Sequence, residues 1–167
     1  MATASPSWAR TTAEHSAQAR EAAAGLCPVL DAADPGEGGP HDEAGGEADA
    51  LLLVYTSGTT GRPKGAVLDQ RALLFNALNS LHMHGYTRDD HVLTILPLFH
   101  VGGLNIQTVP ALFAGATVTL HRRFDPAAFF AACGTARPTI SLLVPAVMGA
   151  LVGHPGWAGA DLSCLRM

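Results

Sequence analysis

The distribution of apolar and polar residues divides the chain at about residue 50. Residues 31–50, DAADPGEGGPHDEAGGEADA, are rich in glycine and acidic residues and contain no lysine, arginine or aromatic residue. Such a segment cannot bury enough apolar surface to offset the entropy lost on ordering it. We therefore predict that residues 1–50 form a low-complexity, disordered acidic segment, in which the alanine-rich residues 9–26 can form a helix. Residues 51–167 are predicted to form a domain.

From Leu51 onward, short apolar runs alternate with runs of helical period. The short runs predict strands at residues 51–56, 66–68, 91–96, 116–121 and 139–144. The longer runs predict helices at residues 69–85, 102–113, 126–133 and 145–152, with Asp69 and Asp125 as N-caps and Gly85 as a C-cap. This alternation is typical of an α/β fold, here a partial parallel-sheet βαβα subdomain in which residues 51–56 form a buried strand. Such sheets bind ligands at the carboxyl ends of their strands.

Composition narrows the classes of partner. The chain is 48% hydrophobic and 14% charged, with a net charge of -4, which offers no basic surface to nucleic acid. No run of apolar residues is long enough for a transmembrane segment or signal peptide, so we expect a cytoplasmic protein. The three cysteines are far apart and indicate buried free thiols, and no metal site is predicted. Asp89 and Asp90 follow a predicted turn and are expected to be solvated.

One loop combines several groups that bind phosphate. YTSGTTGRPKG, residues 55–65, follows a predicted strand and contains the chain's only lysine, Lys64. Glycines let backbone N–H groups converge on an anion, and hydroxyls with a lysine favour a polyphosphate. The nucleotide-binding pattern GxxxxGK[ST] is not matched, because Pro63 and Gly65 stand at two of its defining positions. The alternative is a surface loop whose small residues only turn the chain.

Three segments carry a resemblance to a known family. TSGTTGRPKG, residues 56–65, closely resembles the signature loop of the AMP-forming adenylating enzymes, and residues 96–126 resemble the acyl-CoA synthetase branch. Residues 139–166 match more weakly, so the resemblance covers about residues 49–167. It implies the N-terminal domain of a synthetase that uses ATP, Mg²⁺ and coenzyme A to convert a small carboxylic acid to acyl adenylate and then acyl-CoA. The apolar character of residues 98–113 favours a fatty acid.

The resemblance also implies roles for particular residues. The phosphate cradle would consist of Thr56, Ser57, Gly58, Thr59, Thr60, Gly61 and Lys64. The acid-binding pocket would include Phe99, His100, Gly102, Gly103 and Leu104. Lys64 and His100 are the catalytic candidates, although a core histidine bonded to backbone is the alternative for His100.

The sequence also departs from the family pattern. Asp69 and Gln70 stand where many relatives have a threonine-histidine pair, and the downstream magnesium, ribose and lysine signatures do not occur in the chain. We therefore expect a truncated piece of a ligase that is inactive alone. The alternative is a non-catalytic nucleotide-binding or partner-pairing module, half of a split ligase whose partner is the missing remainder.

Overall fold

The computed structural model describes residues 9–11, 16–23, 29–31, 45–56 and 63–167, and the chain divides into two compact units, Met1–Ala44 and Gly45–Met167. In the first unit, β1 (Ala9–Thr11) and β2 (Val29–Asp31) pair in parallel, and α1 (Ser16–Ala23) lies between them in the chain. The helix falls inside its predicted range, whereas the two strands are additional to the predicted elements. Residues 32–44 lie outside the described residues, so the acidic segment stays a prediction.

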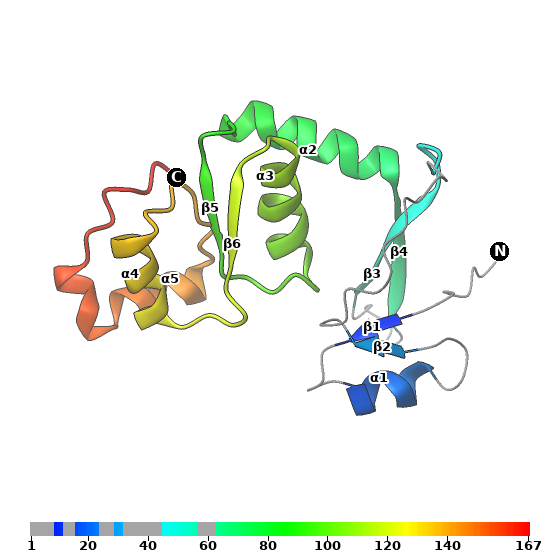
Figure 1. The fold of residues 1–167 in the computed structure, drawn as a ribbon, viewed down its shortest axis with the longest axis horizontal. Coiled ribbons are helices and arrows are strands. Elements are labelled where there is room, and N and C mark those ends of the chain that lie inside the picture. Colours follow the sequence, from blue (N-terminus) through cyan, green and yellow to red (C-terminus); the bar gives the residue numbers. More distant parts are fainter. Residues whose placement is uncertain (1–8, 12–15, 24–28, 32–44, 57–62) are drawn as a thin grey trace. The chain divides into compact units, whose positions relative to one another are not determined.

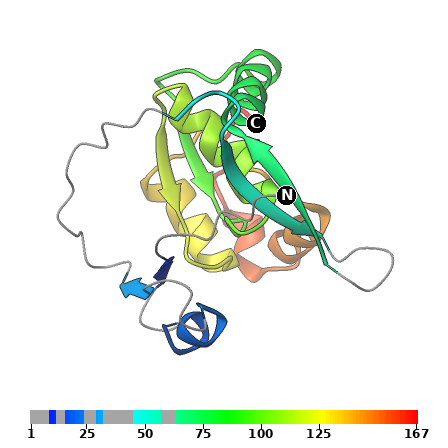
Figure 2. The same ribbon diagram turned by 90° about the vertical axis from the view of Figure 1, so that its right-hand side faces the viewer.

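The second unit begins with an antiparallel hairpin of β3 (Ala50–Thr56) and β4 (Lys64–Asp69), seen side by side in Figure 2. The prediction of a buried parallel strand at residues 51–56 is therefore wrong. Parallel strands need a crossover of about a dozen residues or more, and residues 57–63 are too few. The apolar run is not buried either, since more than half of the side-chain surface is exposed at Leu51, Leu53 and Tyr55.

Helix α2 (Gln70–His84) has the two ends that its sequence predicts. The Asp69 carboxylate accepts a hydrogen bond from the N–H of Ala72 at 2.6 Å, which satisfies one of the unpaired donors of the first turn. Gly85 ends the helix in the left-handed conformation, with φ of 60°, and its N–H donates to Leu81 O. Both caps act locally, which is why the pattern located them.

Two parallel strands, β5 (His91–Thr94) and β6 (Thr117–Leu120), form the centre of this unit. Residues 139–144 lie beside β5, where the N–H of Leu93 donates to Ile140 O at 2.9 Å, but they make only an isolated parallel bridge. The predicted strand is shortened to this bridge because Ser141 bonds elsewhere. Its N–H donates to Met167 O and its hydroxyl donates to Leu93 O.

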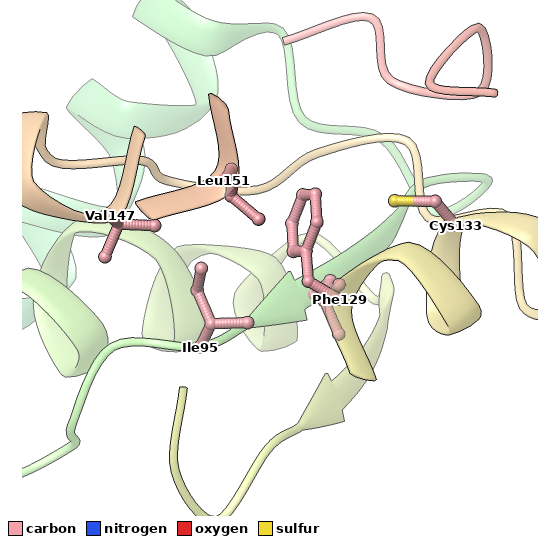
Figure 3. Close-up of a cluster of buried hydrophobic side chains, with 6 residues drawn as sticks. Ile95, Phe129, Cys133, Val147 and Leu151 are labelled. Carbon is pink, nitrogen blue, oxygen red and sulfur yellow. The ribbon is translucent and has the colours of Figure 1, made fainter. Parts of the chain in front are cut away.

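Helices cover both faces of the β5–β6 pair (Figure 1). On one side lie α4 (Pro126–Thr135) and α5 (Pro145–Val152), and Figure 3 shows Ile95, Phe129 and Leu151 pointing toward one another between them and the sheet. The other face is covered by α3 (Val109–Phe113), which follows a π-helical segment, η2 (Gly102–Thr108). A short 3-10 helix, η3 (Pro155–Gly159), follows α5. The predicted α/β class is confirmed, and the described residues of the second unit contain one parallel pair and one antiparallel hairpin.

The helix predicted at residues 102–113 is thus two segments of different winding. In the first, the N–H of Val109 donates to Leu104 O, one residue further back than in an α-helix. Pro110, which has no N–H to donate, is the second residue of α3. The proline therefore lies at a helix start, where it breaks no hydrogen bond.

Candidate functional site

The loop end of the β3–β4 hairpin brings a residue with a hydroxyl and a residue with an ammonium group together. Thr56 and Lys64 lie opposite each other in the register, and the Thr56 hydroxyl donates to Lys64 O at 3.4 Å. Both residues are exposed, and the Lys64 ammonium forms no ion pair with another described residue. This donor set fits an anionic phosphate group. The other predicted cradle residues lie outside the described residues, namely Ser57, Gly58, Thr59, Thr60 and Gly61.

A second segment, residues 96–104, connects β5 to η2 and holds the predicted acid-binding residues. His100 is exposed, which excludes the core-histidine alternative. Its Nδ1 accepts a hydrogen bond from the N–H of Gly102 at 3.1 Å, so the ring is held by its own backbone with Nε2 directed elsewhere. Phe99 next to it is 91% exposed and therefore contributes little to the core.

The two glycines in this segment are buried, and one of them is required by packing. A Cβ on Gly103 would lie 2.5 Å from both Leu96 O and Pro97 O, closer than any ordinary contact. The start of η2 can approach the end of β5 only because this side chain is absent. The structure thus gives Gly103 a packing role, whereas the resemblance implied a place in the acid-binding pocket.

A cavity of about 200 Å³ lies between β3 and residues 98–104. One wall comes from β3 and the other from the segment before η2, and its lining residues are Leu52, Leu53, Val54, Leu98, Phe99, His100, Val101 and Leu104. Three of the predicted acid-binding residues, Phe99, His100 and Leu104, are thus brought to the strand that ends at Thr56. Gly102 and Gly103 do not line it. The arrangement offers a largely apolar wall beside the strand that ends at Thr56.

Sequence reasoning missed two buried amides in η2. Gln107 is 0% exposed, and among the described residues neither its Oε1 nor its Nε2 has a hydrogen-bond partner. Oδ1 of Asn105 is also buried without a partner among these residues. The neighbouring Thr108 is satisfied, because its hydroxyl donates to Gly103 O at 2.7 Å. The signal in the sequence is two amides within a helix predicted to be largely apolar.

An ion pair between the buried Asp90 and the partly exposed Arg166 was also missed. Asp90 is 5% exposed, so the prediction that it is solvated is wrong, whereas Asp89 is exposed as expected. Arg166 donates from Nε to Oδ1 of Asp90 at 2.9 Å and from Nη2 to Oδ2 at 2.8 Å. This hydrogen bonding holds the pKa of the Asp90 carboxyl well below its usual range. The same guanidinium donates to Gly85 O, which ties the end of the chain to the end of α2.

The cysteine thiols and the possible metal ligands do not add a reactive group to this site. Cys133 is buried, as predicted, and burial raises the pKa of its thiol to about 12; Cys164 is half-buried, and Cys27 lies outside the described residues. The described part of the chain contains no cluster of three metal-ligating side chains. Within the same residues, no helix is both long and apolar enough to span a membrane.

Comparisons with known proteins match the sequence and the fold of the chain to one family. A family model described as AMP-binding enzyme matches residues 3–167, which includes residues before the motifs. The chain is 54% identical over 132 residues to an indoleacetate–CoA ligase of Aromatoleum aromaticum, covering 79% of this chain and 26% of that protein. It is 44% identical over 137 residues to a feruloyl-CoA synthase of an Amycolatopsis species, covering 82% and 27%. The chain thus spans about a quarter of the length of these curated relatives.

One solved structure illustrates the likeness of the folds. ATP-bound MatB from Rhodopseudomonas palustris superposes with a TM-score of 0.75 at 28% identity, and the match covers 91% of this chain and 32% of that one.

Proposed function

Because the chain belongs to the family of AMP-binding enzymes, we propose that it carries the part of an AMP-forming acid–CoA ligase that holds the phosphates of ATP and one side of the acid. The observation that carries this proposal is the cavity between β3 and residues 98–104. In this cavity, Phe99 and His100 lie next to β3. The strand ends at Thr56, which pairs with Lys64 of β4.

The proposed reaction has two steps. A carboxylate oxygen of the acid attacks the α-phosphorus of ATP and pyrophosphate leaves; the thiol of coenzyme A then attacks the acyl carbon and AMP leaves. Mg²⁺ would neutralise part of the charge on the phosphates. The Lys64 ammonium and the Thr56 hydroxyl would hold the leaving phosphates, together with Ser57 to Gly61. Such preformed donors are what the attack of one anion on another requires.

His100 is proposed to position the substrate. Its Nδ1 is occupied by the Gly102 N–H, so the ring can donate from Nε2 at a fixed orientation. Phe99 offers an exposed apolar ring at the cavity wall, where it can pack against an acid without first leaving the core.

For the acid itself we propose an aryl-substituted carboxylic acid. The two curated relatives are named for indoleacetate and ferulate, both aromatic acids. The predicted fatty acid rests only on the apolar character of residues 98–113, and it remains the competing substrate in the experiment below.

We further propose that this chain alone does not complete the reaction. A non-catalytic module that pairs with the remainder of a ligase is the second candidate, because Leu53 and Tyr55 of the hairpin are more than half exposed. Exposed apolar strands of this kind favour pairing with another chain.

Calorimetric titration of the chain with Mg-ATP tests the phosphate assignment. Lys64→Ala should weaken binding by about tenfold, because a charge-assisted hydrogen bond is lost. Arg88→Ala is the control, since it removes an exposed cation in the turn after α2. Equal affinities for Lys64→Ala and the unmodified chain would refute the assignment.

Pyrophosphate exchange with a panel of aromatic and fatty acids tests the activity. We expect no exchange above background from this chain alone. Exchange stimulated by a fatty acid and not by an aryl acid would contradict both the proposed substrate and the proposed inactivity.

A further inference from the structure

Two of the three cysteines lie next to each other in the folded chain. Cys133, in the last turn of α4, is 0% exposed and belongs to the buried cluster of Figure 3. Cys164, in the segment after η3, is half-buried and packs against the same cluster. Its thiol donates to the carbonyl oxygen of Cys133, with Sγ and O 3.7 Å apart. Both thiols are free, so the two residues form a pair of neighbouring reduced sulfurs.

The two thiols interact with each other and differ in accessibility. Burial raises the pKa of the Cys133 thiol to about 12, and the neighbouring Cys164 thiol adds to this rise. A thiol in such surroundings stays protonated and out of contact with a dissolved reagent. Cys164, which is only half-buried, is therefore the sulfur that a small oxidant reaches first, and Cys133 is the thiol beside it.

The segment that carries Cys164 is tied to the rest of the second unit by hydrogen bonds. The Arg166 N–H donates to Thr139 O at 2.8 Å. The Ser141 N–H donates to Met167 O at 3.1 Å. The two cysteines are 31 positions apart in the chain, and a covalent link across a loop of this length strongly restricts the unfolded state. A bond between the sulfurs would therefore fasten this segment to α4 and stabilise the fold.

We propose that Cys133 and Cys164 are a redox-modification site, at which a hydroperoxide joins the two sulfurs in a reversible disulfide. In the first step the Cys164 sulfur attacks one oxygen of hydrogen peroxide; the O–O bond breaks, and a sulfenic acid and one water form. In the second step the Cys133 sulfur attacks Sγ of Cys164; the S–S bond forms, and the hydroxyl group leaves as water with the Cys133 proton. Two thiols are thus oxidised by two electrons while one peroxide is reduced to two waters. Exchange with an external dithiol restores both thiols.

Treatment of the whole 167-residue chain with hydrogen peroxide tests the chemistry. Mass spectrometry of a chymotryptic digest should find a fragment pair linked through Cys133 and Cys164, and dithiothreitol should separate it. Cys27→Ser is the matched control, since it removes the remaining cysteine and should leave this link in place. Cys164→Ser should abolish the link. A disulfide that involves Cys27 instead, or oxidation of Cys164 to a sulfinic acid without a link, would overturn the proposal.

Thermal unfolding shows whether the link acts on the fold. The oxidised chain should melt at least about 5 °C higher than the same sample after reduction with dithiothreitol. Hydrogen exchange at the Arg166 and Ser141 amides should also slow several-fold, because the link fastens the segment that these amides hold. Cys164→Ser treated with the same peroxide undergoes the same methionine oxidation and should show neither change. If the linked chain melts no higher than the reduced chain, the two sulfurs do not fasten the fold and the proposal fails.

Discussion

At Gly103 the backbone leaves no room for a side chain. Because a Cβ would meet Leu96 O and Pro97 O at 2.5 Å, Gly103→Ala must push η2 away from the end of β5. We expect a loss of about 2 kcal/mol or more in the free energy of unfolding, measured by urea denaturation. Gly149→Ala in α5 is the control, since its Cβ would meet no atom within 4 Å and should stabilise by about 0.5–1 kcal/mol. Equal effects of the two changes would contradict this interpretation.

A substitution at Phe99 tests acid binding with little effect on the stability of the fold. The ring is 91% exposed, so Phe99→Ala should change the free energy of unfolding by less than about 0.5 kcal/mol. If the ring packs against the acid, the same change should weaken acid binding several-fold in calorimetric titration. Phe113→Ala is the control, because it removes an exposed ring outside the cavity and should leave acid binding unchanged. Unchanged acid affinity in Phe99→Ala would remove Phe99 from the proposed pocket.

Single residues were predictable from the sequence where their partners are close in the chain. Asp69 and Asp125 cap helices through an N–H three residues away, and such caps follow from local chemistry. Asp90 was misjudged because its partner, Arg166, lies 76 residues further along. The burial of Gln107 could not be predicted for a similar reason, since it results from the packing of other elements around η2.

Between elements, the Asp90–Arg166 pair fastens the end of the chain to β5 and α2. Arg166→Met keeps an apolar stem but leaves the Asp90 carboxylate buried without its ion partner. We expect a loss of about 2 kcal/mol in unfolding free energy, less than for a fully buried pair, because the guanidinium is 42% exposed and solvent screens it. The control is Arg137→Met, which breaks the exposed pair with Asp161 and should change little. A similar loss in both variants would show that burial of Asp90 is not the cause.

The same pair should make stability depend on pH. Hydrogen bonding from Arg166 lowers the pKa of Asp90 in the folded chain below its unfolded value of about 3.9. The unfolded chain therefore binds this proton at higher pH, so the stabilisation is complete above about pH 5 and is lost as the pH falls toward the lower folded pKa. In urea denaturation between pH 7 and pH 3, the difference between the unmodified chain and Asp90→Asn should shrink below about pH 4. A difference that is constant with pH would contradict this origin.

Helices were predicted better than strand pairing. The helix starts at Asp69 and Asp125 follow from caps. The π-helical winding of residues 102–108 and the short 3-10 helix η3 were not predicted. Strand partners depend on contacts that a single apolar run does not encode. Residues 51–56 were therefore placed in a parallel sheet although they form an antiparallel hairpin, and residues 139–144 were given a longer pairing than they make.

For the chain as a whole, the decisive sequence information was in two motifs distant from each other. Residues 56–65 and 96–104 were assigned to one site by resemblance; the cavity places part of the second segment beside β3, the strand that leads into the first. The identity of the acid could not be read from either motif, because the cavity between β3 and residues 98–104 is lined by residues that are far apart in the sequence. Its shape exists only in the folded chain.

The exposed apolar face of the β3–β4 hairpin is expected to promote self-association of the whole molecule. Tyr55 and Val67 are 66% and 63% exposed, and apolar strands exposed in this way promote self-association. Tyr55→Thr combined with Val67→Thr puts a residue of high β-propensity at each position but removes apolar surface. Sedimentation velocity should then show self-association beginning at a several-fold higher concentration, with an unchanged melting temperature.

A control on α2 distinguishes the hairpin from exposed apolar surface in general. Met83 is 75% exposed, and Met83→Gln removes an apolar side chain while preserving helix propensity. If self-association requires the hairpin face, this change should leave the sedimentation profile as it is, because a single exposed apolar residue is not a docking surface. Equal relief of self-association by Met83→Gln and by the hairpin variant would mean that the strands have no special part in it, and the partner-pairing candidate would lose its structural support.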